Sequence, residues 1–239
     1  DAKEQKQEIW VLFQDLSKAY DRVNIHMLRK AMQRLKLPLA FIDLIEDIFT
    51  ERKNSVFTEV GLTDPYEMLV GIDQGEVMSP LLWCIYYDPL LYEIEQQELG
   101  YNLTHYYKQN IYSTREEYLS MCVGDLAFMD DTTWITETKD SLETILEIAD
   151  DFYNLNSIKV NKDKSELLVY DPNNPQLNRN SIILKFGDDQ IEITPKLYNE
   201  SARILGVWVN LDGNKNYVIQ QMHDEVTKLC LVLKRKPIT

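Results

Sequence analysis

Residues 8 to 23 read EIWVLFQDLSKAYDRV, an apolar stretch that leads into a polar one. Its first seven residues are mostly apolar and predict a short buried strand that ends at Asp15. A strand ending on an acidic residue is ordinary by itself. A second acidic signal, Phe128-Met129-Asp130-Asp131, lies between two apolar stretches. For an isolated Asp-Asp pair a solvated turn is the common explanation, although adjacent carboxylates also suit a cation.

Apolar spacing and turn residues predict the other elements. Helices are expected at 25–36, 38–49, 79–98 and 140–155 and at the C-terminal end. Strands are expected at 55–60, 66–72, 118–123, 127–136, 157–160, 165–170, 181–186, 190–194 and 203–210, with a turn around residues 63–65. The tyrosine-rich segment 101–117 is expected to be a long loop. This order predicts an α+β fold, a sheet with helices on one face.

Composition limits the class of protein. The 239 residues are 44% hydrophobic, enough for one core with a packed subdomain. No apolar run reaches the roughly 20 residues that cross a bilayer, and no signal peptide is visible. We therefore expect an intracellular protein, in the nucleus or the cytoplasm, with no membrane partner. Its three cysteines are expected to be reduced core thiols. The net charge of −14 by itself argues against nucleic-acid binding.

Three further motifs each have an ordinary explanation. The stretch 71–75 reads GIDQG and precedes Ser79-Pro80, which suits a loop before a helix. The stretch 161–164, NKDK, suits a charged turn. Leu205-Gly206 inside a strand suits a bulge.

The five motifs, taken in order, resemble motifs A to E of the reverse transcriptases. The resemblance is nearest to the non-LTR retrotransposon and group II intron types. The matching residues are 13–23 for motif A, 71–82 for B, 128–131 for C, 158–166 for D and 204–207 for E. The resemblance covers about residues 9 to 212. It implies a polymerase palm, with a ferredoxin-like or RRM-like antiparallel sheet, plus part of the fingers.

The resemblance also implies a role for each site residue. Asp15 and Asp130 would hold two Mg²⁺ ions, with the Leu16 carbonyl and Asp131 completing the shell and Mn²⁺ as a substitute. Tyr20 would be the steric gate that excludes a ribose 2′-hydroxyl. The other implied roles are nucleotide contacts for Gln74 and Gly75, proton donation to pyrophosphate for Lys164, and a primer grip for Leu205 and Gly206. For Lys164 an ordinary exposed lysine is an equal explanation.

The implied organisation is a palm interrupted by a fingers insertion. Residues 1–24 would be palm, 25–72 partial fingers, 73–212 palm, and 213–239 the start of a thumb or a connecting helix. The implied partners are an RNA or DNA template with its primer, and dNTPs; the oligomeric state stays open. The chain is expected to be a fragment without the N-terminal fingers and the thumb, with little processive synthesis of its own. Glu76 departs from the family pattern and would place a negative charge near a triphosphate.

Three alternatives remain open. An RNA-dependent RNA polymerase palm shares the order of motifs A to C, but Tyr20 and Gln74-Gly75 favour reverse transcriptase. A degenerate domain with a scaffold role would suit the acidic charge and Glu76. Against it, clustered buried carboxylates are costly to keep without a metal. A two-metal nuclease would leave the 71–82 motif unexplained.

Overall fold

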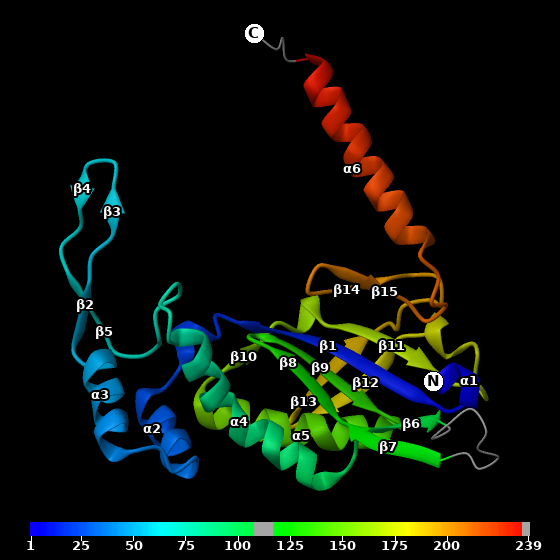
Figure 1. Cartoon of the computed structure of the whole chain (residues 1–239), viewed down its shortest axis with the longest axis horizontal. Coiled ribbons are helices and arrows are strands. Elements are labelled where there is room, and N and C mark those ends of the chain that lie inside the picture. Colours follow the sequence, from blue (N-terminus) through cyan, green and yellow to red (C-terminus); the bar gives the residue numbers. More distant parts are fainter. Residues whose placement is uncertain (108–116, 236–239) are drawn as a thin grey trace.

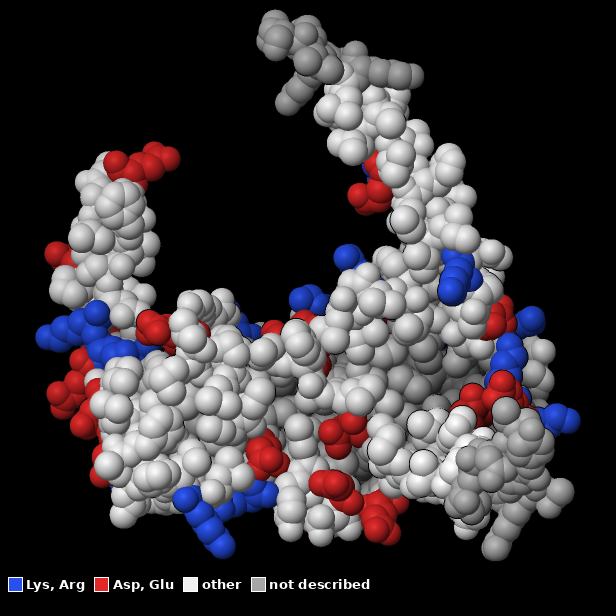
Figure 2. Space-filling model, in the orientation of Figure 1, with Lys and Arg blue, Asp and Glu red and all other residues white. Residues whose placement is uncertain are grey.

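A computed structural model describes residues 1–107 and 117–235 of the chain. Figure 1 shows a central sheet with helices on one side and two arms that project from the other side. One arm is a hairpin of β3 (Phe57–Thr58) and β4 (Gly61–Leu62), and the other is α6 (Asn216–Arg235). An open hollow lies between the arms (Figure 2).

The central sheet is antiparallel and is built around β1 (Ile9–Ser17). Its strand order is β10 (Lys159–Val160), β1, β9 (Asp131–Thr136) and β8 (Asp125–Phe128), and β11 (Glu166–Tyr170) also pairs with β1. Even-numbered residues of β1 are buried and odd-numbered ones are half-buried, as expected for a strand with one covered face. The covered face packs on α4 (Ser79–Gln97) and α5 (Lys139–Asn156) (Figure 1). The predicted α+β architecture with helices on one face is confirmed.

A polar network lies inside this covered face. Gln14 Oε1 accepts hydrogen bonds from Trp134 Nε1 at 3.0 Å and from the Tyr153 hydroxyl at 3.2 Å. The Tyr153 hydroxyl is also 2.6 Å from that of Tyr87, which lies 3.0 Å from Thr132 Oγ1. Because buried polar groups need partners, this network favours the observed register between β1, β9 and the two helices.

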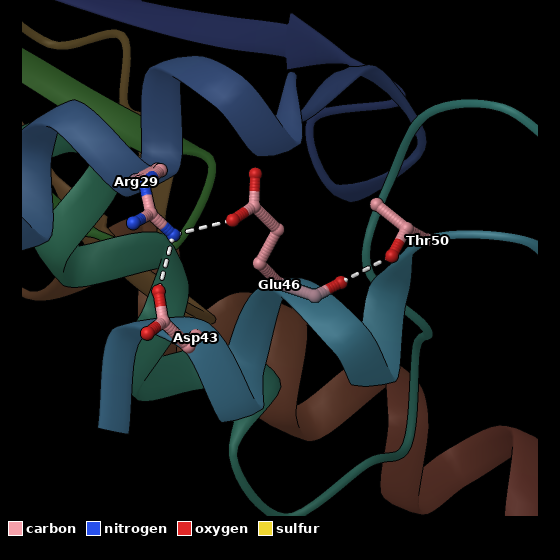
Figure 3. Close-up of polar contacts among 4 residues, drawn as sticks. All are labelled: Arg29, Asp43, Glu46 and Thr50. Atoms are coloured by element: carbon pink, nitrogen blue, oxygen red, sulfur yellow. Dashed lines mark hydrogen bonds and ion pairs between the residues drawn. The ribbon is translucent and has the colours of Figure 1, made fainter. Parts of the chain in front are cut away.

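Helices α2 (Ile25–Arg34) and α3 (Leu39–Phe49) lie together beside the sheet, and α2 also packs against α4 (Figure 1). Arg29 on α2 contacts two carboxylates of α3, bonding Asp43 Oδ1 at 2.8 Å and also Glu46 Oε2 (Figure 3). The Thr50 hydroxyl donates to the Glu46 carbonyl oxygen at 2.7 Å, just past the end of α3. The helices expected at 25–36 and 38–49 are therefore present, joined by polar contacts as well as by apolar packing.

The segment that follows α3 differs from the expectation of two strands joined at residues 63–65. β2 (Arg52–Asn54) pairs with β5 (Tyr66–Met68), and beyond them β3 pairs with β4. The chain reverses at residues 59–60, where the Thr58 hydroxyl donates to the Gly61 carbonyl oxygen at 2.7 Å. Gly61 has a φ of 120°, which favours glycine and fixes the turn earlier than Asp64-Pro65 suggested.

The long loop expected at 101–117 is also wrong over its described part. β6 (Tyr101–Tyr107) pairs in register with β7 (Glu117–Val123), and residues 108–116 lie outside the described residues. The Tyr106 and Tyr118 rings face each other across the ribbon, with centroids 6.2 Å apart. Tyrosine and threonine suit a pleated surface, so this composition favours strands even without a clean apolar alternation.

The C-terminal third contains two hairpins before α6. One joins β12 (Ile182–Phe186) to β13 (Asp189–Ile193), and the other joins β14 (Ala202–Ile204) to β15 (Val207–Val209). The single strand expected at 203–210 is therefore wrong. Leu205 and Gly206 form the turn of the β14–β15 hairpin, with φ of 48° and 80°. The short helical segments are α1 (Ala2–Gln5), η1 (Tyr20–Arg22), η2 (Lys162–Lys164) and η3 (Leu177–Arg179).

Two expectations about burial can be compared with the structure. Cys84, Cys122 and Cys230 are all exposed, so the prediction of core thiols is wrong. Cysteine is apolar enough to be buried, but each of these positions falls on a solvent-facing side of its element. No helix within residues 1–107 and 117–235 is long and apolar enough to cross a membrane.

Candidate active site

Asp15 and Asp131 are directly opposite each other on neighbouring strands. The register of β1 and β9 pairs Asp15 with Asp131, and both side chains lie on the open face of the sheet. Directly opposed residues have Cβ atoms about 4.5–5.5 Å apart, and like charges in this position repel. The apolar run suggested that the strand ends at Asp15, but β1 continues for two more residues to Ser17.

Asp130 lies beside this pair, in the turn between β8 and β9. Met129 opens the turn with a φ of 57°, a conformation that residues with a side chain rarely adopt. Asp130 is exposed, whereas Asp15 and Asp131 are half-buried. The expectation of buried clustered carboxylates is therefore wrong, because the open face of the sheet leaves all three within reach of solvent.

Lys164 supplies the positive charge nearest to the pair. Its Nζ is 3.2 Å from Asp15 Oδ2, although the lysine side chain is 65% exposed. Burial raises the pKa of Asp131, Asp130 and Asp15 raise it further, and Lys164 opposes them. Mutual repulsion of the three carboxylates is thus partly offset by one lysine.

The donor chemistry of the site suits a hard divalent cation. Carboxylate and carbonyl oxygens are the ligands that Mg²⁺ and Mn²⁺ prefer. The side chains as placed do not form a finished shell: within the described ranges no three His, Cys, Asp or Glu side chains are grouped to hold a metal. One oxygen of Asp15 instead pairs with Lys164.

A cavity of about 480 Å³ opens on this site. It is lined by six of the predicted residues together with five others: Asp15, Leu16, Ser17, Lys18, Ala19, Tyr20, Gln74, Met129, Asp130, Asn161 and Lys164. Residues from motifs A, B, C and D therefore meet at one place. Leu16 is buried, which leaves its backbone rather than its side chain for binding.

Tyr20 lies at the base of this cavity in η1. Its hydroxyl donates to Met129 Sδ at 3.2 Å, and its ring meets Trp83 edge-on with centroids 5.8 Å apart. Burial raises the pKa of Tyr20, and Asp130 and Cys84 add to the shift. The ring is therefore fixed next to the carboxylates as a neutral phenol. The sequence did not indicate Trp83 or Met129 as partners of Tyr20.

The 71–75 loop is fastened to the segment that follows Tyr20. The Gly71 amide donates to the Val23 carbonyl oxygen at 2.8 Å, and the Ile72 amide to that of Tyr20 at 2.9 Å. Gly71 has a φ of 95°, and a Cβ there would lie 3.0 Å from the Asp21 carbonyl oxygen. This attachment brings Gln74 to the cavity.

The other two notable residues of the loop point elsewhere. Gly75 has a φ of 93° and open space where a Cβ would be. Glu76 is exposed and does not line the cavity, so its charge faces solvent.

Arg52 binds the 71–75 loop and holds it in place. The sequence did not indicate this role for Arg52. Its guanidinium donates to the Gly71 carbonyl oxygen at 2.6 Å and pairs with Asp73. Its side chain is 11% exposed and lies over the Phe49 ring at 4.8 Å. No pattern near Arg52 in the sequence signals this contact, which joins residues about twenty positions apart.

The Leu205-Gly206 turn lies on the other side of the carboxylates. Leu205 lines a second cavity, of about 340 Å³, together with Asp15, Asp131 and Lys164. Gly206 has open space around it. The structure thus brings motif E within one cavity of the acidic pair, while Gly75 and Gly206 line neither cavity.

This fold and site define a class, a polymerase-type α+β domain with acidic residues from two adjacent strands on its open face. Residues 1–209 match the family model "Reverse transcriptase (RNA-dependent DNA polymerase)", and the chain belongs to this family. The match confirms the family that the five motifs indicated.

The chain is also similar to particular relatives. It is 23% identical over 150 residues to the retrovirus-related Pol polyprotein from the type-2 retrotransposable element R2DM of Drosophila melanogaster, covering 63% of this chain and 13% of that protein. Among solved structures, apo telomerase from Candida tropicalis truncated from the C-terminal domain has a TM-score of 0.57 at 16% identity. That match covers 89% of this chain and 36% of the telomerase chain. A second apo telomerase structure from Candida tropicalis has a TM-score of 0.53 at 14% identity, covering 88% of this chain and 33% of that one. The structural matches show a shared fold.

Proposed function

We propose that this domain is the core of an RNA-directed DNA polymerase that joins nucleotides to a primer 3′-hydroxyl. The observation that carries the proposal is the placement of Asp15 opposite Asp131, with Asp130 and Tyr20 on the adjoining cavity. Carboxylates from two strands at one point are what two-metal phosphoryl transfer requires. Membership of the reverse transcriptase family supports DNA as the product.

Asp15, Asp130 and the Leu16 carbonyl are the groups we assign to Mg²⁺, with Asp131 completing the set and Mn²⁺ as a substitute. Bound metal would neutralise charge on the triphosphate and lower the pKa of the attacking hydroxyl. The protein's own part is to hold the carboxylates together on the sheet. Lys164, at 3.2 Å from Asp15, would move towards the departing pyrophosphate and give it a proton or a compensating charge.

The remaining assignments follow the family resemblance, and Tyr20, Gln74 and Leu205 are the three of these residues that line a cavity. Tyr20 would lie under the sugar of the incoming nucleotide, where its fixed ring leaves no room for a 2′-hydroxyl. Gln74, on the cavity wall, and Gly75 beside it would contact the nucleotide and its paired template base. Leu205 and Gly206 would grip the primer end beyond Asp131.

The family resemblance suggests a domain assignment, which the two projecting arms support (Figure 1). Residues 1–24 and 73–212 would form the palm, 25–72 part of the fingers, and 213–239 the start of a thumb or a connecting helix. The hollow between the two arms is then where a primer–template duplex of RNA or DNA would lie (Figure 2). Basic side chains (Lys and Arg) and acidic side chains (Asp and Glu) are both visible around this hollow. The net charge of −14 therefore does not make that face uniformly acidic.

A single-nucleotide insertion assay on RNA and DNA templates tests the proposal. We expect incorporation of dNTPs that needs Mg²⁺ or Mn²⁺ and is abolished in Asp130→Asn. Asp125→Asn is the matched control, since Asp125 lies on the same hairpin but lines neither site cavity. Equal incorporation by wild type and Asp130→Asn, or none by either, would refute the proposal.

A non-catalytic binding role is the second candidate. It is favoured by the unfinished metal shell among the described side chains and by the acidic balance of the chain. Calorimetry with Mn²⁺ on wild type and Asp130→Asn separates the two candidates, because a catalytic site predicts cation binding that depends on the carboxylate. Preference for rNTPs over dNTPs would instead indicate an RNA polymerase.

A further inference from the structure

Two aromatic side chains of α4 contact the β8–β9 hairpin on either side of its adjacent carboxylates. Trp83 Nε1 donates to the Met129 carbonyl oxygen at 2.6 Å. The Tyr87 hydroxyl lies 3.0 Å from Thr132 Oγ1. Because residues four apart share a helix face, one side of α4 is bonded immediately before Asp130 and immediately after Asp131.

Trp83 is itself firmly fixed. Its side chain is 1% exposed, and its ring stacks on that of Tyr87 at 5.3 Å and 20° and lies 6.0 Å from that of Tyr86. A buried N–H without an acceptor is costly, so the indole keeps the Met129 carbonyl in one place. This bond favours the positive φ of Met129, which the backbone alone would rarely adopt.

The same indole also touches Tyr20. The two rings meet at 60° with centroids 5.8 Å apart, and the Tyr20 hydroxyl donates to Met129 Sδ at 3.2 Å. Tyr20, Trp83 and Met129 therefore form a closed triangle of contacts. None of the three can shift without weakening a contact with the other two.

We propose that Trp83 is a positioning residue that fixes the Tyr20 ring and the Met129-Asp130 turn relative to each other, and so sets discrimination between dNTPs and rNTPs. The inference rests on the proposed polymerase function. Trp83 does not line the cavity and acts through Tyr20 and Met129. A small displacement of the Tyr20 ring would change the space available to the sugar, and a small displacement of Met129 would change the position of Asp130.

Trp83→Phe tests the inference, because it keeps an aromatic ring and removes the N–H donor. Tyr86→Phe is the matched control: Tyr86 is buried on the same helix, and its hydroxyl accepts a bond from the Asn24 amide at 3.2 Å, away from the hairpin. The measurement is the ratio of kcat/KM for a dNTP to that for the matching rNTP. We expect this ratio to fall about fivefold or more in Trp83→Phe and to stay unchanged in Tyr86→Phe.

The ratio separates positioning from simple loss of stability. A variant that only reduces the folded fraction lowers both values of kcat/KM equally and leaves the ratio unchanged. Tyr20→Phe, which removes the bond to Met129, should lower the ratio as well. Adding Trp83→Phe to it should change the ratio by less than the product of the single effects, because both act through the same triangle.

Each result has one meaning. No carboxylate-dependent incorporation by wild type would defeat the proposed function, whereas an active wild type with an unchanged ratio in Trp83→Phe would overturn this inference. If Trp83→Phe fails to fold, Met129→Leu decides, since it removes the sulfur acceptor and keeps the backbone bond. A lowered ratio in Met129→Leu supports the triangle, and an unchanged ratio overturns it.

Discussion

Replacing Gln14 by Met should destabilise the domain, because the Gln14 side chain accepts hydrogen bonds from Trp134 and Tyr153 inside the core. Met has a similar shape, but its thioether sulfur is a much weaker acceptor than the Gln14 amide oxygen for the buried donors of Trp134 and Tyr153. Trp134 would lose its amide-oxygen acceptor, which costs about 1–3 kcal/mol. Tyr153 would keep Tyr87 as a partner and lose less.

One term opposes this loss. Gln14 Nε2 is buried and has no hydrogen-bond partner among the described residues, so removing it relieves a penalty of about 1 kcal/mol. The net expectation is a loss of about 1–2 kcal/mol in the free energy of unfolding. For a chain of this length, that corresponds to a decrease in Tm of roughly 2–8 °C.

Urea unfolding followed by circular dichroism measures the loss as a shift of midpoint at constant slope. The informative control is a double-mutant cycle with Trp134→Phe, which removes the donor as well. The double variant should be more stable than the sum of the single losses predicts, by about 1 kcal/mol. A Gln14→Met variant as stable as wild type, or additivity within about 0.3 kcal/mol, would show that the Gln14 hydrogen bonds do not stabilise the core.

Three further changes have expected outcomes. Burial and the neighbouring Glu95 raise the pKa of Asp125 to about 6, so the folded state binds its proton more tightly than the unfolded state. The contribution of Asp125 to stability should therefore fall as pH rises from about 4 to about 6. Asp125→Asn should reduce this pH-dependent change in the free energy of unfolding by about 1–2 kcal/mol, after allowing for partial exposure. If urea unfolding gives the same pH dependence for wild type and Asp125→Asn over this range, the prediction is wrong. Gly71→Ala should cost about 1 kcal/mol more than Gly75→Ala in thermal melts, because only Gly71 meets backbone where a Cβ would lie; equal losses would disprove this. Lys164→Met should slow single-nucleotide incorporation about 10²-fold, whereas Lys162→Met, whose lysine pairs with Asp189, should act like wild type. Equal rates in the two lysine variants would rule out a special role for Lys164.

The sequence predicted those parts of the fold that depend on local patterns. The helical period of α5 and the apolar run before Asp15 are short-range signals, and both elements appear within two residues of their expected bounds. The ribbon at 101–107 was missed because its tyrosines and polar residues lack a strong apolar alternation. Cys84 was misplaced because an apolar residue on a helix gives no sign of which side faces solvent.

The candidate site shows the same division. The resemblance to reverse transcriptases implied that Asp15, Tyr20, Gln74 and Asp130 belong to one site, and the four residues line one cavity. The contacts that hold this arrangement could not be predicted. The bonds from Arg52 to the 71–75 loop and from Trp83 to the hairpin depend on side-chain directions across distant elements, which no local pattern encodes.

The alternation of β1 has a consequence for the kinds of sequence change that the domain tolerates. Even positions of this strand belong to the core and odd positions include Asp15, so insertion or deletion of one residue exchanges the two sets. Such a change would place the Asp15 carboxylate in the interior and expose the leucines of β1 to solvent. The domain would then lose both its stable core and its candidate active site. Substitutions on the odd side leave the core intact. Descendants of this gene should therefore keep the length of β1 and vary mainly at its odd positions other than Asp15.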